Sequence, residues 1–426
     1  MTAAILLLGF LGLLALGLPV AVALAGSGIV FALVDGSVPM VAIVHRMVGG
    51  VDSFPLLCVP FFVLAGLLMN TGGITERIYD FAVAAVGWMR GGLAQVNVVG
   101  SVVFAGMSGT AVGDAAGLGT IEVRAMRAHG YDPGFAVGIT AASSMLGPLL
   151  PPSLPLVVYG VSANASIGQL FAAGIVPGLL LAASLMLMVR FYAGRRGYGA
   201  DAPFRPRDVA RSLARGVLPL ATPVIIIGGM RGGLFTPTEG AIAAVAWALF
   251  LGCVVFRTLG LRALAKVSFE AVEITAVILV IVAGSEVFGW MLTTTRASEQ
   301  VVGWVLSLTD QRWLILLLAN LFLLVIGLAL EPLPAILILT PIMLPVMEAV
   351  GVDPVHFGLV MVLNLCIGLL TPPVGIVLFI LARVAGIGFG EAARGVAPFM
   401  VPLLAVLALC TYWPAMVLWL PTMWYR

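Results

Sequence analysis

Two proline pairs, Pro151-Pro152 and Pro372-Pro373, interrupt strongly apolar stretches of the chain. Proline has no backbone N–H and does not continue a helix, so each pair frees carbonyl oxygens of the preceding turn from helical hydrogen bonding. Free carbonyls at membrane depth bind Na⁺, and the N–H groups of a helix that restarts after the break suit an anion. Each pair therefore predicts an interrupted helix with ion-binding chemistry.

Each interruption has a partner segment in which a second helix must turn. These segments are "MSGTAVGD" from Met107 and "LALEPLPA" from Leu328. We expect one sodium site at Ser108, Gly109 and Thr110 with the carbonyls of Gly147, Leu150 and Pro152. A second site would use Glu331 and Pro332 with the carbonyls of Gly368, Thr371 and Pro373. The candidate contacts for an anionic substrate are Ser108, Thr110, Ser153, Thr371 and Gly375; the alternative is that these residues only turn the chain.

Other polar residues in the apolar stretches have two readings each. Asp114 either caps the returning helix or tunes the ion site, and Asn97 and Asn364 either join helices or belong to a site. Glu239 has a structural explanation, because Thr236 three residues earlier predicts a capping box.

The composition places these residues in a membrane protein. Hydrophobic residues make up 62% of the 426-residue chain and charged residues only 9%, against about 25% charged in soluble domains. Apolar runs of about 20 residues recur throughout, each long enough to cross a bilayer as a helix. We expect an all-α polytopic membrane protein in which Met1 to Val34 is a retained first span, and the net charge of +2 gives no reason to expect a nucleic-acid partner.

The chain contains an internal repeat. "GYDP" at Gly130 matches "GVDP" at Gly351 with an offset of 221, and the same offset superposes the two proline pairs. Arginines flank the first copy, whereas no Lys or Arg lies between Trp313 and Asp353 of the second, so the positive-inside rule predicts opposite orientations. We expect inverted repeats at 1–193 and 216–426, joined by a cytoplasmic basic loop at 194–215, with the N-terminus inside and the C-terminus outside.

Re-entrant hairpins explain segments of unsuitable length. The stretch from Arg90 to Arg124 would form a rod of about 45 Å, too long for one span and too short for two. We therefore predict hairpins at 92–124 and 312–348, each followed by a broken helix, at 133–162 and 353–382.

Several of these stretches resemble the large membrane subunit of tripartite ATP-independent periplasmic (TRAP) transporters. The matching sequences are "DSFPLLCVPFFVLAGLLMNTGGITERI", "GGLAQVNVVGSVVFAGMSGTAVGDAAGLG", "GPLLPPSLPLVVYG", "GGLFTPTEGAIAAVAWALF", "GLLTPPVGIVLF" and "WPAMVLWLP". Glu331 would be the acidic residue found near the second hairpin tip in many members, and here Pro332 follows it.

The resemblance implies an elevator-type ion transporter fold and sodium-coupled import of an organic acid anion through the inner membrane of a bacterium or archaeon. It also implies two protein partners, a small four-helix membrane subunit and a periplasmic substrate-binding protein. Sodium would be the only metal, with no other cofactor. The substrate stays open among a C4-dicarboxylate, sialic acid, another sugar acid and a sulfonate.

Two other functions compete with this one. The first is a stand-alone sodium-coupled anion transporter that needs no binding protein. The second is an intramembrane hydrolase using Ser108 or Ser153, but neither serine lies in a G-x-S-x-G motif, and the histidines lie away from both predicted tips. We therefore expect a transporter and no enzyme.

Overall fold

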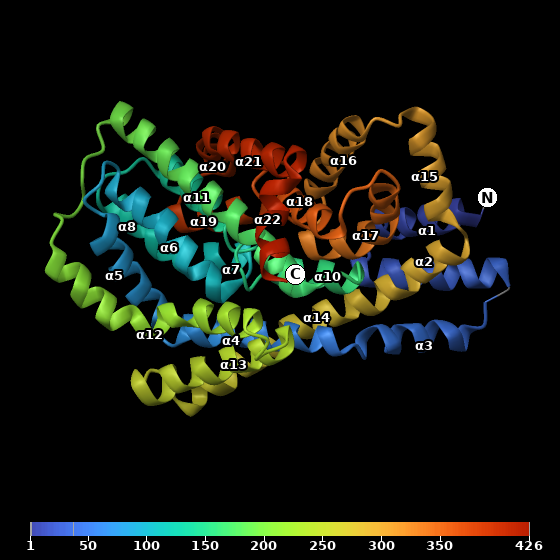
Figure 1. Cartoon of the computed structure of the whole chain (residues 1–426), viewed down its shortest axis with the longest axis horizontal. Helices are drawn as coiled ribbons and strands as arrows, with labels where there is room; N and C mark the ends of the chain where they lie inside the picture. The colour runs from blue at the N-terminus through green and yellow to red at the C-terminus, as the bar shows by residue number, and fades with distance from the viewer. Residues whose placement is uncertain (1, 37, 426) are drawn as a thin grey trace.

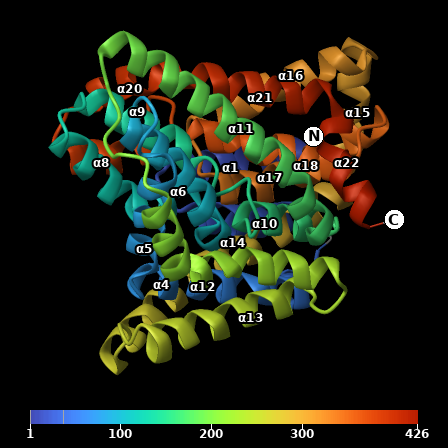
Figure 2. The same ribbon diagram turned by 60° about the vertical axis from the view of Figure 1, so that its left-hand side comes forward.

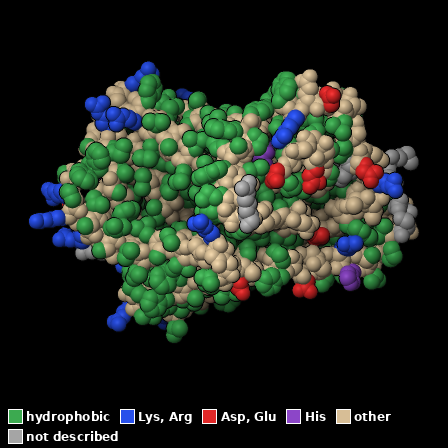
Figure 3. Space-filling view, viewed as in Figure 1, with side chains coloured by type: hydrophobic (Ala, Val, Ile, Leu, Met, Phe, Trp, Pro, Cys, Tyr) green, Lys and Arg blue, Asp and Glu red, His purple; other side chains and the backbone are tan. Residues whose placement is uncertain are grey.

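The computed structural model describes residues 2–36 and 38–425, and every regular element in them is helical. Six helices of this described part are long and apolar enough to cross a membrane, or up to eight if two bent helix pairs each count as a span. Apolar side chains cover much of the surface shown in Figure 3, as expected for contact with lipid. The all-α membrane fold predicted from the sequence is confirmed.

The first half runs from the N-terminus to a long helix that ends near residue 196. Its elements are α1 (Thr2–Ala15), α2 (Val20–Asp35), α3 (Met40–Val51), η1 (Phe54–Leu57), α4 (Cys58–Thr71), α5 (Ile74–Val86), α6 (Gly92–Ser108), α7 (Ala111–Ala116), α8 (Leu118–Ala128), α9 (Pro133–Ser144), α10 (Leu154–Ser162) and α11 (Ile167–Arg196).

The second half also contains a hairpin followed by an interrupted helix. Its elements are α12 (Pro206–Arg231), α13 (Pro237–Leu249), η2 (Phe250–Val255), α14 (Leu261–Thr294), α15 (Ala297–Leu308), α16 (Arg312–Gly327), α17 (Pro332–Ala349), α18 (Pro354–Gly368), α19 (Ile376–Ala385), α20 (Phe389–Val396), η3 (Ala397–Phe399), α21 (Met400–Tyr412) and α22 (Pro414–Trp424).

The predicted single span from Met1 to Val34 is wrong for the described residues. The chain forms two helices, α1 and α2, which pack against each other. The break contains Gly17, with a φ of 81°, and Pro19, which precedes α2. Left-handed backbone followed by proline stops one helix and starts the next.

Local chemistry sets the ends of the interrupted helices in both halves. Asp132 accepts the Phe135 N–H at 2.7 Å and caps α9, and Asp353 accepts the Val355 N–H at 2.8 Å and caps α18. Each Asp is followed by proline at the first helical position, where a missing N–H costs nothing. The repeated Asp-Pro pair therefore starts both helices in the same way.

The basic connection between the halves is shorter than predicted. Residues 194–196 belong to α11 and residues 206–215 belong to α12, so the irregular segment covers only 197–205. This segment is tied down, because the Asp201 carboxylate accepts the Tyr131 hydroxyl at 2.5 Å and the Leu93 N–H at 2.8 Å. The connection thus links the N-terminal end of α6 to the turn between α8 and α9.

A separate group of helices lies on one side of the hairpins. α13 packs against α4, and α14 packs against α2, α3 and α4. Figures 1 and 2 show α4, α12 and α13 along one side of the molecule, with α6, α8 and α11 on the other. Basic side chains gather at the end that carries α5 and α8 in Figure 3, in keeping with the predicted cytoplasmic end.

Candidate transport site

The first hairpin tip touches the first broken helix directly. Gly109, with a φ of 62°, ends α6, and Thr110 caps α7 by accepting the Gly113 N–H at 3.0 Å. The Leu154 N–H, at the start of α10, donates to the Gly109 carbonyl at 3.1 Å. The pairing of tip and break expected from the sequence is therefore present.

Glycines make this approach possible. A Cβ placed on Gly109 would lie 2.5 Å from the Pro152 carbonyl oxygen, and one placed on Gly147 would lie 2.7 Å from the Thr110 carbonyl oxygen. Real Cβ atoms do not approach oxygen so closely, so backbone meets backbone here. Four of the six residues predicted for the first sodium site, Gly109, Thr110, Gly147 and Pro152, thus lie in contact.

Several oxygens in this contact have no protein partner. No hydrogen bond among the described residues reaches the carbonyls of Gly147, Leu150 or Pro152. The Ser108 hydroxyl oxygen is buried and also unpaired. Buried oxygens without partners are costly unless a ligand satisfies them, and neutral oxygens are suitable ligands for Na⁺.

Ser153 has a structural task that limits its part in a site. Its hydroxyl donates to the Pro148 carbonyl and accepts the Leu156 N–H at 3.3 Å, which caps α10. The predicted substrate contact through Ser153 therefore competes with two existing hydrogen bonds.

The second break is built differently from the first. Gly368 packs against Gly327 at the end of α16. The second break therefore contacts the first helix of its hairpin and not the residues at the hairpin tip. The Gly368 carbonyl accepts the Thr371 N–H at 3.0 Å, and the Thr371 hydroxyl donates to the Ile367 carbonyl at 3.0 Å. Pro372 and Pro373 are exposed, whereas Pro151 and Pro152 are buried. Of the three carbonyls predicted for this site, that of Gly368 is already hydrogen bonded.

A cavity of about 640 Å³ joins the two hairpin tips. It is lined by Ser108 to Thr110 of the first tip, Pro148 and Pro152 of the first break and Glu331 to Pro334 of the second tip. Thr371 and Gly375 do not line it. The predicted substrate residues Ser108 and Thr110 therefore share one cavity with Glu331 and Pro332, which were assigned to the second sodium site.

Two acidic residues of this cavity were missed at the sequence level. Glu270 and Glu273 of α14 line it, one helical turn apart. Their spacing within a long apolar helix was the available signal, since i and i+3 residues share a helix face. With Glu331 they place three carboxylates around the cavity.

The candidate asparagines join helices in both repeats. The Asn97 side chain donates to Thr140 and accepts from Ser143, each at 2.6 Å, which links α6 to α9. Asn364 donates to the Asn320 side chain at 2.7 Å, which links α18 to α16. Ser143 and Asn364 are related by the repeat offset of 221, so both hairpins are fixed to their broken helices at matching places. Asp114 is buried in the first turn of α7, and the Thr110 side chain caps that helix.

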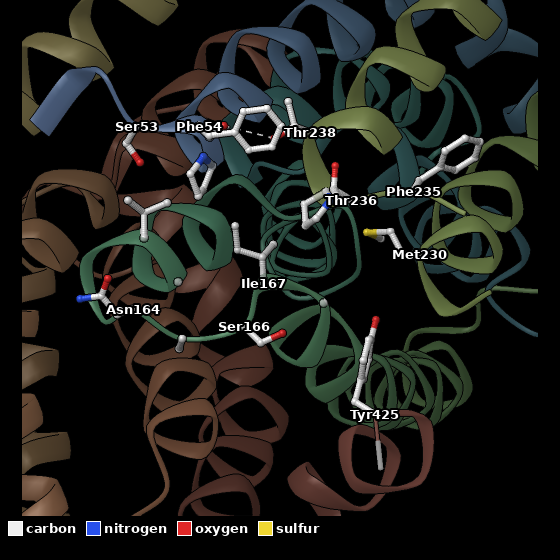
Figure 4. Close-up of a pocket in the computed structure, with 16 residues that line it drawn as sticks. Ser53, Phe54, Asn164, Ser166, Ile167, Met230, Phe235, Thr236, Thr238 and Tyr425 are labelled. Carbon is white, nitrogen blue, oxygen red and sulfur yellow. Dashed lines mark hydrogen bonds between the residues drawn. The ribbon is translucent and has the colours of Figure 1, made fainter. Parts of the chain in front are cut away.

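A second cavity, of about 490 Å³, lies between the α10–α11 turn, the start of α13 and Tyr425 (Figure 4). Its lining consists of apolar and hydroxyl-bearing residues and the Asn164 amide, and it contains none of the predicted site residues. Thr236 and Glu239 at its edge form the predicted capping box, with the Thr236 N–H donating to Glu239 at 2.7 Å. The structural explanation of Glu239 is confirmed.

Comparison with known proteins identifies the family. The model of the DctM component of tripartite ATP-independent periplasmic transporters matches residues 7–416. This chain is a member of the DctM family. The chain is 47% identical over 413 residues to the sialic acid TRAP transporter large permease protein SiaM of Vibrio cholerae, covering 97% of each chain.

Other DctM relatives and one solved structure extend the comparison. The C4-dicarboxylate large permease DctM of Pseudomonas aeruginosa is 39% identical over 87% of each chain, and the 2,3-diketo-L-gulonate large permease YiaN of Escherichia coli is 37% identical over 97% of each. The crystal structure of the YdaH transporter of Alcanivorax borkumensis superposes with a TM-score of 0.67 at 16% identity, covering 89% of this chain and 88% of that one. The last likeness concerns the fold alone.

Proposed function

We propose that this DctM-family chain is the large permease of a sodium-coupled importer of an organic acid anion. The observation that carries the proposal is the cavity that both hairpin tips line, beside the unpaired oxygens of the first break. Neutral oxygens for a cation lie next to a space for a small molecule. This is the arrangement expected of a secondary transporter that couples an ion to a substrate.

Sodium would be held at the first site by the Ser108 hydroxyl and the carbonyls of Gly147, Leu150 and Pro152. A second ion would bind near Thr371 and Glu331. Each net positive charge that moves inward across 100 mV releases about 2.3 kcal/mol. Two sodium ions with one monovalent anion would therefore draw energy from the membrane potential as well as from the sodium gradient.

The substrate proposal follows the relatives. SiaM, YiaN and DctM are named for sialic acid, 2,3-diketo-L-gulonate and C4-dicarboxylates, which are all organic acids. Since SiaM shares 47% identity along nearly the whole chain, sialic acid is the first compound to test.

Transport would occur by an elevator mechanism in the inner membrane. The hairpins and broken helices would move as one body, held together by the Asn97 and Asn364 bonds, past a scaffold that includes α4, α13 and α14. A small membrane subunit would widen this scaffold, and a periplasmic protein would deliver the substrate.

Reconstitution in liposomes tests the proposal. The chain would be purified together with its small subunit. Uptake of labelled sialic acid would then be measured with and without the substrate-binding protein, under a sodium or a potassium gradient. We expect uptake only with sodium and the binding protein. Uptake that needs sodium but no binding protein would favour a stand-alone transporter, and uptake without sodium would refute the coupling.

A further inference from the structure

Glu122, on α8, lies inside the protein with no partner for its carboxylate. Its side chain is 1% exposed, and neither Oε1 nor Oε2 receives a hydrogen bond from a described residue. Asp114 on α7 is also 1% exposed and has an unpaired Oδ2. The proposed transport site uses none of these oxygens, so this buried pair needs its own explanation.

The helices packed against Glu122 supply no compensating positive charge. α6 and α9 contain no charged residue. On α5, Tyr79 is the titratable residue that interacts electrostatically with Glu122. The Arg77 guanidinium of the same helix stacks over the Phe256 ring instead. The arginines of α8 and α19 are Arg124, Arg127 and Arg383. All three are exposed, and none forms an ion pair with Glu122 in the described structure.

Several hydroxyl and amide donors of α6 and α9 are already used in other hydrogen bonds. Asn97 donates to Thr140, and Ser143 donates to Asn97. The Ser101 hydroxyl donates to the Ser143 hydroxyl at 3.2 Å. The Glu122 carboxylate lies against the α6 backbone at Gly100, because a Cβ placed on Gly100 would lie 2.8 Å from Oε1. Glu122 is therefore an acceptor without a donor.

An ionised carboxylate buried in this way is very unfavourable, and such a group keeps its proton instead. A second carboxylate nearby makes ionisation harder still, because two like charges oppose each other in a buried site. We propose that Glu122 carries a proton at neutral pH, so that the first hairpin contains a proton-binding site separate from the sodium site. Loss of this proton would place a second negative charge between α6 and α8 and loosen the hairpin that carries Ser108.

Infrared spectroscopy of the purified full-length chain tests the site without relying on transport. A protonated carboxyl group gives a carbonyl-stretch band that a carboxylate lacks. At neutral pH we expect Glu122→Gln, which keeps the shape of the neutral acid, to remove the intensity of one carboxyl group per chain. Asp310→Asn, at an exposed residue in no described ion pair, is the matched control and should leave the band unchanged.

A pH titration separates this site from a purely structural role. Asp114→Asn removes the second ionisable group, so that Glu122 no longer has to lose its proton beside another carboxylate, and its deprotonation should occur at a pH lower by about one unit. An unchanged titration in Asp114→Asn would refute the coupling of the pair. A wild-type protein whose neutral-pH spectrum lacks the Glu122 band would overturn the proposal. The proposal would also fail if Glu122→Gln left the band unchanged but abolished thermal stabilisation by sodium. That result would indicate that Glu122 belongs to a sodium site.

Discussion

Gly147 lies so close to Thr110 that a Cβ at position 147 would sit 2.7 Å from the Thr110 carbonyl oxygen. The two residues belong to the first break and the first hairpin tip, and they meet backbone to backbone. The sodium binding proposed for this place would depend on that close approach, because the proposed ligands come from both segments.

The first prediction follows from this contact. Gly147→Ala should push the tip away from the break at a cost of about 1–3 kcal/mol, as other overpacking changes do, and lower sodium-dependent uptake at least tenfold. The measurement is uptake in liposomes, with thermal unfolding as the check on folding. Gly303→Ala is the control, because a Cβ there would meet nothing within 4 Å. Normal uptake by Gly147→Ala would contradict the tight contact.

The second prediction concerns the unpaired Ser108 hydroxyl. Ser108→Ala should weaken sodium affinity about tenfold while leaving stability unchanged or slightly higher, since the lost oxygen has no protein partner. Sodium-dependent thermal shift measures both quantities. Ser285→Ala is the control, as that buried hydroxyl only donates to Val282 in its own helix at 2.8 Å. Equal sodium affinity in wild type and Ser108→Ala would rule Ser108 out as a ligand.

The third prediction tests the second sodium site. Thr371→Ala should weaken the sodium dependence of uptake while leaving membrane insertion intact. The Thr371 hydroxyl lone pairs are free to bind a cation, because its hydrogen is donated to the Ile367 carbonyl. If Thr371→Ala transports with wild-type sodium dependence, the second site lies elsewhere.

The fourth prediction concerns the bond between Asn364 and Asn320. A double-mutant cycle with Asn364→Ala and Asn320→Ala should give a coupling energy of about 0.6 kcal/mol, the average found for hydrogen bonds between membrane helices, and no more than about 1.7 kcal/mol. Thermal or denaturant unfolding in detergent provides the four stabilities. Pairing Asn364→Ala with the distant Ser285→Ala should give no coupling. A zero value for the asparagine pair would mean that this bond does not hold α18 to α16.

The fifth prediction concerns the carboxylates of the cavity wall. Glu270 and Glu273 should repel an anionic substrate that enters the cavity. The double variant Glu270→Gln with Glu273→Gln should therefore bind the substrate more tightly by roughly twofold to tenfold. Inhibition of uptake by substrate loaded inside the liposomes measures this affinity. Glu299→Gln, on α15 and away from the cavity lining, should have no effect. Weaker binding in the double variant would mean that the glutamates contact the substrate favourably.

The sequence by itself determined the features that depend on local chemistry. Low charge and repeated apolar runs required a membrane protein. The Asp-Pro pairs set where α9 and α18 begin, and the Pro-Pro pairs lie in the interruptions that follow these helices. A missing N–H and a capping carboxylate act within a few residues, so they can be recognised without knowing the fold. The repeat offset then predicted that each hairpin would meet a broken helix.

Tertiary structure decided which atoms remained free and which residues met. Gly147 and Gly368 are equivalent in the repeat, yet only the Gly147 carbonyl lacks a hydrogen bond in the described structure. Glu273 joined the cavity and Glu122 was buried because helices distant in the sequence pack around them. Burial and hydrogen bonding are properties of pairs of segments, and the pattern within either segment does not contain them.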